Sequence, residues 1–488
     1  MDWSKESVGI SDVNLRNVFK YEPEATRVAK IQSPNKKIDI KLLETDKEWD
    51  QWMDTELPSP DNAESGLILI LARRTGQQTP PIGQDIINNE KTSEPGESND
   101  PLPPNLGGRR GARVLPFSVE TFRSISNKFC LHNSIARVVN RADVPIFSRE
   151  ELEMGQSGGS KYPAYVYNCR STNAWEKDLA LTATHFPHIG LTYAMLFGCP
   201  ISVEDEVIRR LSSIDTAASH PLLMPGIFAE LERRRHIGIV EDYIDKIEGL
   251  IFELDYQAPA GQQVDGSKSE RRNKDKRTQW LDTVYLKHNL INWNTQLGKM
   301  AKHADELNDI LFKPDGGQQS YKESSSLSNI SAGKGTDETK VYNCEMRKIG
   351  TKINDRLQII IEEYEEKARD CTMRIDGMAM ATQWFQGETN VDIALATRRD
   401  SQDMRSIAIV TMVFLPGTFF ASFFSMQFFN WFPDAVGDTV VSQYFWIFVL
   451  VTAMGTLLTV GTWYYIAVVA RRAHRREEGS ENDLSKLV

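Results

Sequence analysis

Two long uncharged stretches near the C-terminus constrain the fold of this chain more than any other feature. No charged residue occurs from Ser406 to Pro433, and none from Tyr444 to Ala470. The strongly apolar part of the first stretch, Ser406 to Phe429, would measure roughly 36 Å as an α-helix at about 1.5 Å per residue. The hydrocarbon core of a bilayer is about 30 Å thick. Two such runs separated by a short loop predict a two-span transmembrane hairpin rather than two buried core helices.

Basic residues flank this hairpin on one side only. Arginines precede the first stretch and follow the second, whereas the connecting loop has no Lys or Arg and carries Asp434 and Asp438. The positive-inside rule therefore places both termini in the cytosol. We expect the two aspartates at the outer mouth, where they either concentrate cations or are ordinary loop residues. The N-terminus resembles neither a signal peptide nor a transit peptide, which favours the plasma membrane over mitochondria.

The first 339 residues are polar and charge-rich, and they predict a helix-rich α/β cytosolic domain. Apolar runs at Leu67–Leu71 and Pro163–Tyr167 predict buried strands. Apolar residues at helical spacing predict helices over Leu222–Phe252 and Trp280–Leu311, and a less regular one over Ser118–Arg141. These elements are sufficient for a packed domain with strands and helices, but they do not fix the order of its strands.

Three segments of this domain lack enough apolar residues to offset the entropy of ordering. They lie near residues 75–113, 257–277 and 314–340, and we expect disordered insertions there. The five cysteines are scattered and form no CxxC pair, which indicates a reduced, cytosolic environment. The formal net charge of −10 argues against a nucleic-acid partner. The Walker phosphate loop and the His-Glu-x-x-His motif are absent, so we expect neither an enzyme nor a cofactor.

A long amphipathic helix is predicted to lead into the first span. The segment 340–403 contains no proline, and apolar residues recur every three or four positions from Ile353 to Ala396, with a break expected near Gly387. The predicted organisation is a cytosolic domain (1–339), a stalk helix (340–403), a first transmembrane helix (404–427), an outer loop (428–443), a second transmembrane helix (444–470) and a basic, then polar cytosolic tail (471–488).

One face of the first span carries hydroxyl groups at helical spacing. At about 100° per residue, these side chains fall within an arc of about 60°. This hydroxyl stripe comprises Thr411, Thr418, Ser422 and Ser425. Met404 and Leu415 lie on or beside the arc. Such a stripe indicates either a surface that meets water or an ion or a helix-packing surface, and the pattern favours neither. Two spans cannot enclose a pore, so a conduit would need several chains around a symmetry axis.

Two sequence motifs in the C-terminal region resemble those of a known protein family. They are Arg405–Thr418, with the sequence RSIAIVTMVFLPGT, and Phe424–Phe428, with the sequence FSMQF. Together with the two-span hairpin and the charged tail, they resemble the CorA family of divalent-cation channels, specifically its filamentous-fungal branch. The resemblance covers about residues 354–472, with looser matches upstream at 115–118, 197–200 and 376–378.

The resemblance implies a homopentamer whose subunits each contribute a stalk helix continuous with a pore-lining first span, while the second span faces lipid. In the family, an Asn ring in a Gly-Met-Asn signature meets hydrated Mg²⁺. Ser425-Met426-Gln427 stands in that place here. Gln keeps a side-chain carbonyl that can contact a cation through water, but the change leaves Mg²⁺ selectivity open. By the same resemblance Thr411 and Thr418 line the pore, and Met404 and Leu415 form apolar constrictions.

Four glutamates cluster on the predicted stalk helix. They are Glu362, Glu363, Glu365 and Glu366. In the CorA family, acidic residues between subunits bind Mg²⁺ and hold the channel closed, whereas the alternative here is a solvated helix face. The predicted function is therefore a homo-oligomeric divalent-cation channel, with Mg²⁺ as the transported and regulatory ion. The alternatives are a non-conducting CorA-like scaffold or sensor, and transport of Zn²⁺, Co²⁺ or Ni²⁺.

Overall fold

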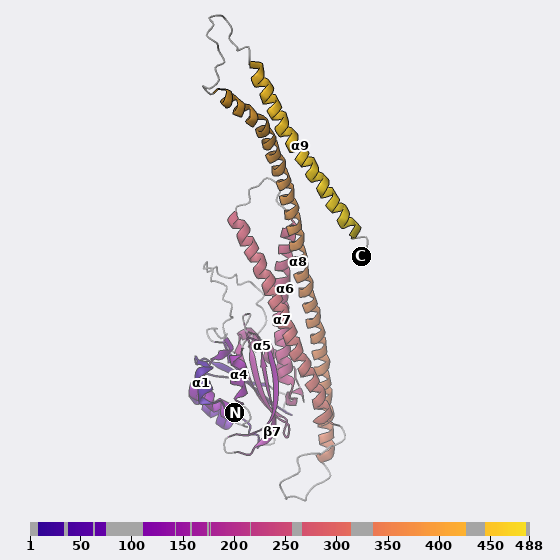
Figure 1. Cartoon of the computed structure of the whole chain (residues 1–488). Helices are drawn as coiled ribbons and strands as arrows, with labels where there is room; N and C mark the ends of the chain where they lie inside the picture. Colours follow the sequence, from indigo (N-terminus) through magenta and orange to yellow (C-terminus); the bar gives the residue numbers. More distant parts are fainter. Residues whose placement is uncertain are drawn as a thin grey trace, which may run out of the picture. The chain divides into compact units, whose positions relative to one another are not determined.

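The protein is described here from a computed structural model, whose elements Figure 1 follows along the chain. The structure describes residues 8–33, 38–61, 64–74, 111–141, 143–156, 159–172, 175, 177–214, 216–255, 266–313, 335–425 and 445–484. The chain divides into two compact units, Met1–Ala381 and Thr382–Val488, and each is described by itself. The described parts contain an α/β region, a long helix and two apolar C-terminal helical segments, which confirms the predicted fold class.

A seven-stranded mixed sheet forms the centre of the first unit (Figure 1). Its strands follow the order β3-β2-β4-β9-β8-β7-β6. Their bounds are β2 Thr26–Ser33, β3 Ile38–Leu43, β4 Ser65–Arg73, β6 Ile146–Met154, β7 Tyr162–Arg170, β8 Ala180–Phe186 and β9 Leu191–Cys199. β4 and β9 pair in parallel, whereas the other neighbours in this sheet are antiparallel. A separate parallel pair joins β1 (Lys20–Tyr21) to β5 (Val114–Leu115). The parallel contact therefore joins two antiparallel halves into one sheet.

Helices cover both faces of this sheet and enclose two apolar cores. On one face lie α1 (Asp12–Asn17), α2 (Asp46–Thr55), α3 (Val119–Lys128) and α4 (Ser134–Asn140). On the other lie α5 (Ile201–Ser212), α6 (Leu223–Asp255), α7 (Gly266–Ile310) and the first part of α8 (Gly335–Phe424). Successive side chains of a strand point to opposite faces, so Leu69 belongs to one core while Ile68 and Ile70 belong to the other.

The predicted strands are confirmed, because Leu67–Leu71 lies in β4 and Pro163–Tyr167 in β7. β4 is covered on both faces, and this is why its sequence is a continuous apolar run rather than an alternating one. The helices predicted around 222–252 and 280–311 are α6 and α7. The helix predicted over 118–141 is in fact two helices, α3 and α4, separated near Cys130, whose φ of 48° interrupts the helical backbone.

Parts of the segments expected to be disordered are folded. Gly111–Arg113 forms the 3₁₀ helix η2, α7 already begins at Gly266, and α8 begins at Gly335. The rest of these segments, residues 75–110, 256–265 and 314–334, lies outside the described residues. The structure therefore has a helix within the last part of each of the three expected insertions.

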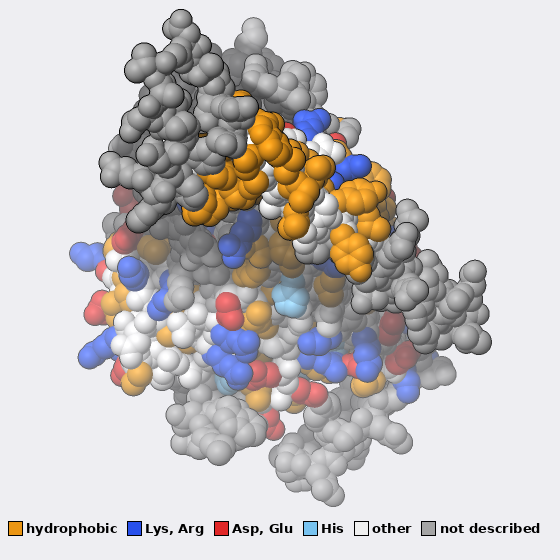
Figure 2. All heavy atoms as spheres, turned by 45° about the horizontal axis from the view of Figure 1, so that its top comes forward, with side chains coloured by type: hydrophobic (Ala, Val, Ile, Leu, Met, Phe, Trp, Pro, Cys, Tyr) orange, Lys and Arg blue, Asp and Glu red, His pale blue; other side chains and the backbone are white. Residues whose placement is uncertain are grey.

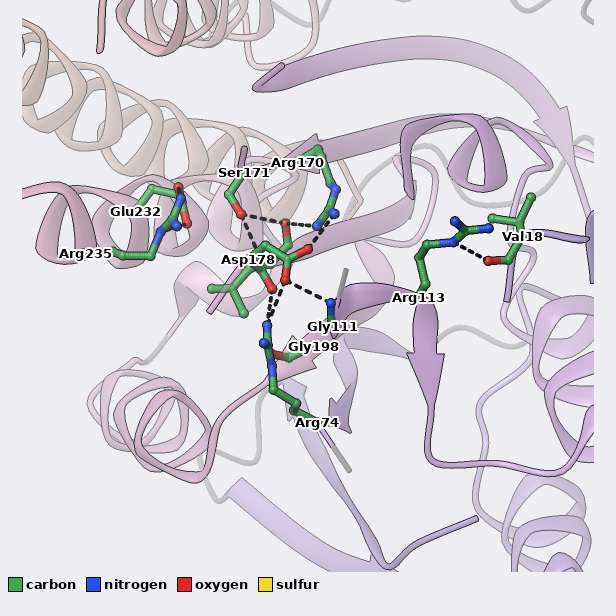
Figure 3. Close-up of polar contacts among 11 residues, drawn as sticks. Val18, Arg74, Gly111, Arg113, Arg170, Ser171, Asp178, Gly198, Glu232 and Arg235 are labelled. Carbon is green, nitrogen blue, oxygen red and sulfur yellow. Dashed lines mark hydrogen bonds and ion pairs between the residues drawn. The ribbon is translucent and has the colours of Figure 1, made fainter. Parts of the chain in front are cut away.

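Buried polar contacts show how η2 is ordered (Figure 3). The fully buried carboxylate of Asp178 accepts hydrogen bonds from Arg170 Nη2 at 2.6 Å, Arg74 Nη2 at 2.8 Å and the backbone N–H of Gly111 at 3.1 Å. Gly198 faces the same place with a φ of 75°, and a Cβ there would lie 2.9 Å from the carbonyl oxygen of Asp178. Only glycine combines that backbone conformation with this approach. A loop-like sequence is thus fixed by partners distant along the chain.

The described part of the second unit consists of two helices. α8 continues through Gly387 and ends at Phe424, so the expected break near Gly387 does not occur. α9 runs from Phe445 to Leu484, beyond the predicted end of the second span at Ala470. Both helices contain a segment long and apolar enough to cross a membrane by length and composition. The predicted stalk helix and first span form one continuous helix, as the resemblance implies.

Candidate functional site: the hydroxyl face of α8

Within the second unit, α9 packs against one face of the apolar part of α8. The rings of Phe424 and Phe448 meet edge to face, with centroids 5.9 Å apart. A Cβ added to Gly455 would lie 2.7 Å from Cε2 of Phe420, so the absence of a side chain at Gly455 permits this approach. Small residues allow close contact between helices in membranes. The α8 face that contains Phe420, Phe424 and the buried Pro416 is therefore the α9 contact face.

The hydroxyl stripe lies on the other side of α8. Its four members, Thr411, Thr418, Ser422 and Ser425, are all exposed in the described chain. At about 100° per residue, Thr418 and Phe420 are separated by about 160° around the helix axis when measured the shorter way. Packing against another helix was one of the two explanations for the stripe. The stripe does not pack against α9 of the same chain, so this helix does not account for it.

Three of the four hydroxyl groups, those of Thr411, Thr418 and Ser425, donate their hydrogens to backbone carbonyls nearby in the chain. Thr411 Oγ1 donates to the carbonyl of Ile407 at 2.8 Å, and Thr418 Oγ1 donates to the carbonyl of Leu415 at 3.0 Å. Ser425 donates in the same way to a carbonyl of its own turn. A hydroxyl has one hydrogen and two acceptor lone pairs, so the outward side of each group is an acceptor. A row of acceptors suits the water hydrogens around a hydrated cation.

The two predicted constrictions are exposed on the stripe side of α8. Leu415 is 65 % exposed and Met404 is 66 % exposed in the described chain. They belong to a wider set of exposed apolar side chains on both helices of this unit, and Figure 2 shows hydrophobic side chains gathered there in a contiguous area. Exposed apolar areas of this kind mark surfaces covered by membrane or protein. The second unit therefore has the surface of a membrane hairpin.

Most of the predicted outer selectivity motif cannot be placed. Ser425, which directly follows α8, is the last described residue before residue 445, and Met426 and Gln427 lie outside the described residues. The same is true of the two aspartates of the predicted outer mouth, Asp434 and Asp438. Their roles as selectivity and mouth residues stay predictions.

Of the four stalk glutamates, Glu363 has a partner in the first unit. Its carboxylate forms an ion pair with Arg233 of α6, with 2.9 Å between Glu363 Oε1 and Arg233 Nη2. Arg374 and Glu248 join the same two helices, with Arg374 Nε 2.7 Å from the carboxylate. The exposed members of the cluster are Glu362, Glu365 and Glu366. Among the described residues, no group of three or more potential metal ligands is close enough to hold a metal ion. Glu363 therefore stabilises the α6–α8 contact, and regulatory Mg²⁺ binding stays a prediction.

One sequence motif needs its structural context to be interpreted. Residues 155–159, Gly-Gln-Ser-Gly-Gly, match the Gly-x-Ser-x-Gly spacing of α/β-hydrolases. In those enzymes the serine lies on a turn from a strand into a helix. Here the motif lies between β6 and β7, which pair as an antiparallel hairpin, and Ser157 is outside the described residues. The motif therefore lacks the strand–turn–helix context of a hydrolase nucleophile.

Comparisons with known proteins give partial likenesses. No family model matches the chain. Notoamide biosynthesis cluster protein M' of Aspergillus versicolor is 31 % identical over 119 residues, which is 22 % of this chain and only 25 % of that protein. The full-length CmaX protein has a TM-score of 0.33 at 10 % identity, covering 91 % of this chain and 99 % of CmaX. The CorA magnesium transporter of Methanocaldococcus jannaschii has a TM-score of 0.31 at 12 % identity, covering 89 % and 96 %. Both TM-scores are below 0.5, so neither likeness by itself establishes a shared fold or function.

Proposed function

We propose that this chain is one subunit of a homo-oligomeric divalent-cation channel whose pore is lined by the hydroxyl stripe of α8. The observation that carries the proposal is the row of exposed hydroxyl acceptors on the side of α8 away from the α9 contact face. Acceptors on an apolar membrane helix are costly unless they meet water, an ion or another helix. A shared axis between several copies provides water and ions to all of these oxygens at once.

The finer parts of the proposal follow the sequence resemblance to the CorA family. We propose five copies, Mg²⁺ as the main cargo, both termini in the cytosol and a place in the plasma membrane. Ser425, Met426 and Gln427 then form the outer selectivity ring, and Leu415 and Met404 form apolar gates. An inside-negative potential drives uptake, because a unit charge gains about 2.3 kcal/mol per 100 mV and a divalent ion about twice that.

Flux through liposomes tests the proposal. The full chain is reconstituted, and entry of Mg²⁺, Zn²⁺, Co²⁺ and Ni²⁺ is followed with a fluorescent reporter inside the vesicles. Thr418→Leu replaces an acceptor in each subunit by an isobutyl group, and we expect it to abolish flux. Gln427→Ala removes the proposed water-contacting carbonyl, and we expect altered ion selection or loss of flux. Val413→Leu, on the opposite face of the same helix, is the matched control and should conduct like the wild type.

The outcomes separate the candidate functions. Flux that survives both Thr418→Leu and Gln427→Ala unchanged would contradict the pore assignment. A wild-type protein that inserts into the vesicles but passes none of the four ions would favour a non-conducting scaffold or sensor. Flux of Zn²⁺, Co²⁺ or Ni²⁺ without flux of Mg²⁺ would support a channel but contradict Mg²⁺ as the transported ion.

A further inference from the structure

A cavity unrelated to the membrane helices lies at one edge of the central sheet in the first unit. It has a volume of about 470 Å³ and is lined by residues of α4, the start of β6 and α7. Among the described strands β6 is the last of the sheet, and the cavity is lined by the first residues of this edge strand. Pockets of about 300–1,000 Å³ are typical of small-molecule sites. The cavity is thus large enough for a compact organic ligand.

Basic side chains give this cavity a positive rim. Arg137, Arg141 and Lys299 all line it. The guanidinium of Arg137 makes no ion pair with any residue in the described ranges, and Arg141 has only a long contact of 3.9 Å with Asp143. Lys299 Nζ donates to the uncharged side-chain amide oxygen of Gln296 at 3.2 Å. Two arginines and one lysine without a close carboxylate partner are the groups that bind phosphate, the arginines in a bidentate manner.

The inner wall of the cavity is polar and fixed by a buried side chain. Ser134 and Ser148 line the cavity, and both contact Asn168, which is 0 % exposed on β7. Asn168 Nδ2 donates to Ser134 Oγ at 2.9 Å and reaches Ser148 Oγ at 3.5 Å, while Asn168 Oδ1 accepts from Thr182 at 2.9 Å. The Ser134 hydroxyl is therefore held at the cavity wall by this buried amide and by His132 Nδ1, which lies 2.9 Å from Ser134 Oγ. A buried polar network of this kind gives a site a defined hydrogen-bonding pattern.

The other residues that line the cavity favour a ligand that has an apolar body and a hydroxyl or amino group in addition to its anionic group. One wall is apolar and consists of Val138, Val144, Pro145, Ile146 and Phe147. Glu150 also lines the cavity, and its carboxylate would repel a second anion but accept a hydrogen bond from a hydroxyl or amino group. We propose that this cavity binds a small organic phosphate of mononucleotide size. Its phosphate contacts Arg137, Arg141 and Lys299, and its body lies on the apolar wall with its polar groups toward Glu150 and Ser134.

Calorimetric titration of the full chain in detergent micelles tests this site. The probes are AMP, GMP, adenosine and inorganic phosphate, each at millimolar concentration. We expect AMP or GMP to bind at least tenfold more tightly than adenosine or inorganic phosphate, because only the nucleotides use both the basic rim and the apolar wall. Arg137→Gln and Lys299→Gln should each weaken nucleotide binding by roughly tenfold, as expected for the loss of one charge-assisted hydrogen bond.

Matched controls keep the test independent of folding and of ion conduction. Lys302→Gln removes an exposed charge from the same helix as Lys299, and Arg16→Gln removes one from α1; neither lines the cavity, so both should bind like the wild type. The melting temperature without ligand reports whether each variant folds. The proposal is overturned if neither nucleotide binds, if inorganic phosphate binds as tightly as both nucleotides, or if Arg137→Gln and Lys299→Gln leave binding unchanged.

Discussion

Buried histidines should make the first unit sensitive to acid. His185 on β8 and His220 before α6 are each only 1 % exposed. Burial lowers the pKa of each imidazole from 6.5 to about 3, and neighbouring histidines add to the effect. His185 Nδ1 lies 2.9 Å from Thr192 Oγ1, a hydrogen bond available to the neutral ring. Both rings are therefore neutral in the folded protein at every pH above about 4.

The size of the effect follows from the difference between folded and unfolded pKa values. Below pH 6.5 the unfolded chain takes up a proton on each ring while the folded chain does not, so stability falls as the pH falls from 6.5 toward 3. Between pH 7 and pH 5 each ring should lower the free energy of unfolding by about 2 kcal/mol, and the two together by about 4 kcal/mol. Buried Glu232 acts in the opposite direction, because burial raises the pKa of its carboxyl.

A variant isolates the imidazole contribution from that of the carboxyl group. Urea unfolding of the full chain in micelles is followed by tryptophan fluorescence at pH 7 and pH 5, since Trp49, Trp52 and Trp293 are buried in the first unit. His185→Gln should reduce the pH dependence of stability by about 2 kcal/mol. The exposed His288 provides the control His288→Gln, which should leave that dependence unchanged. If His185→Gln kept the full wild-type pH dependence, the burial argument would be refuted.

Two further predictions concern packing. Asp178→Ala removes the carboxylate shared by Arg74 and Arg170, and Arg170 is 0 % exposed. We expect this variant to lower the free energy of unfolding by about 3–5 kcal/mol, because a buried charge loses its partner. Urea unfolding indistinguishable from that of the wild type would contradict this prediction. Gly455→Leu should weaken the α8–α9 contact by about 1–3 kcal/mol because its side chain meets Phe420. Gly461→Leu is the control, since a Cβ there meets nothing within 4 Å, and equal melting temperatures of the two variants in micelles would contradict this packing.

Elements that are apolar along their whole length could be predicted from the sequence. β4 and the two apolar spans are continuous apolar runs, so their existence followed from composition alone. β8 was not recognised, because Thr182, Thr184 and His185 interrupt its apolar character. Each is nevertheless buried with a partner: Asn168 for Thr182, the carbonyl of Cys130 for Thr184, and Thr192 for His185. Such partners come from other strands and segments, and no local pattern reveals them.

In the candidate site, too, local features could be predicted from the sequence, whereas contacts between distant residues could not. The angular position of the hydroxyl stripe follows from helical geometry and could be predicted. The face covered by α9 could not, because it depends on Gly455 meeting Phe420 across two helices. The ion pair of Glu363 with Arg233 was likewise hidden, since the acidic cluster gives no sign of which member has a partner 130 residues away. The basic cavity at β6 joins three separate elements and has no sequence signature.

Cysteine accessibility tests most directly whether the hydroxyl stripe faces an aqueous path. Cys344, which is exposed, is first replaced by Ser, while the other four cysteines are buried. Single cysteines are then placed at Thr411, Thr418 and Val413, and the protein in liposomes is treated with a charged, membrane-impermeant thiosulfonate. We predict rapid modification and block of cation flux at Thr411→Cys and Thr418→Cys, with Val413→Cys unreactive. Unreactive stripe positions, or a Val413→Cys that reacts equally fast, would contradict the account.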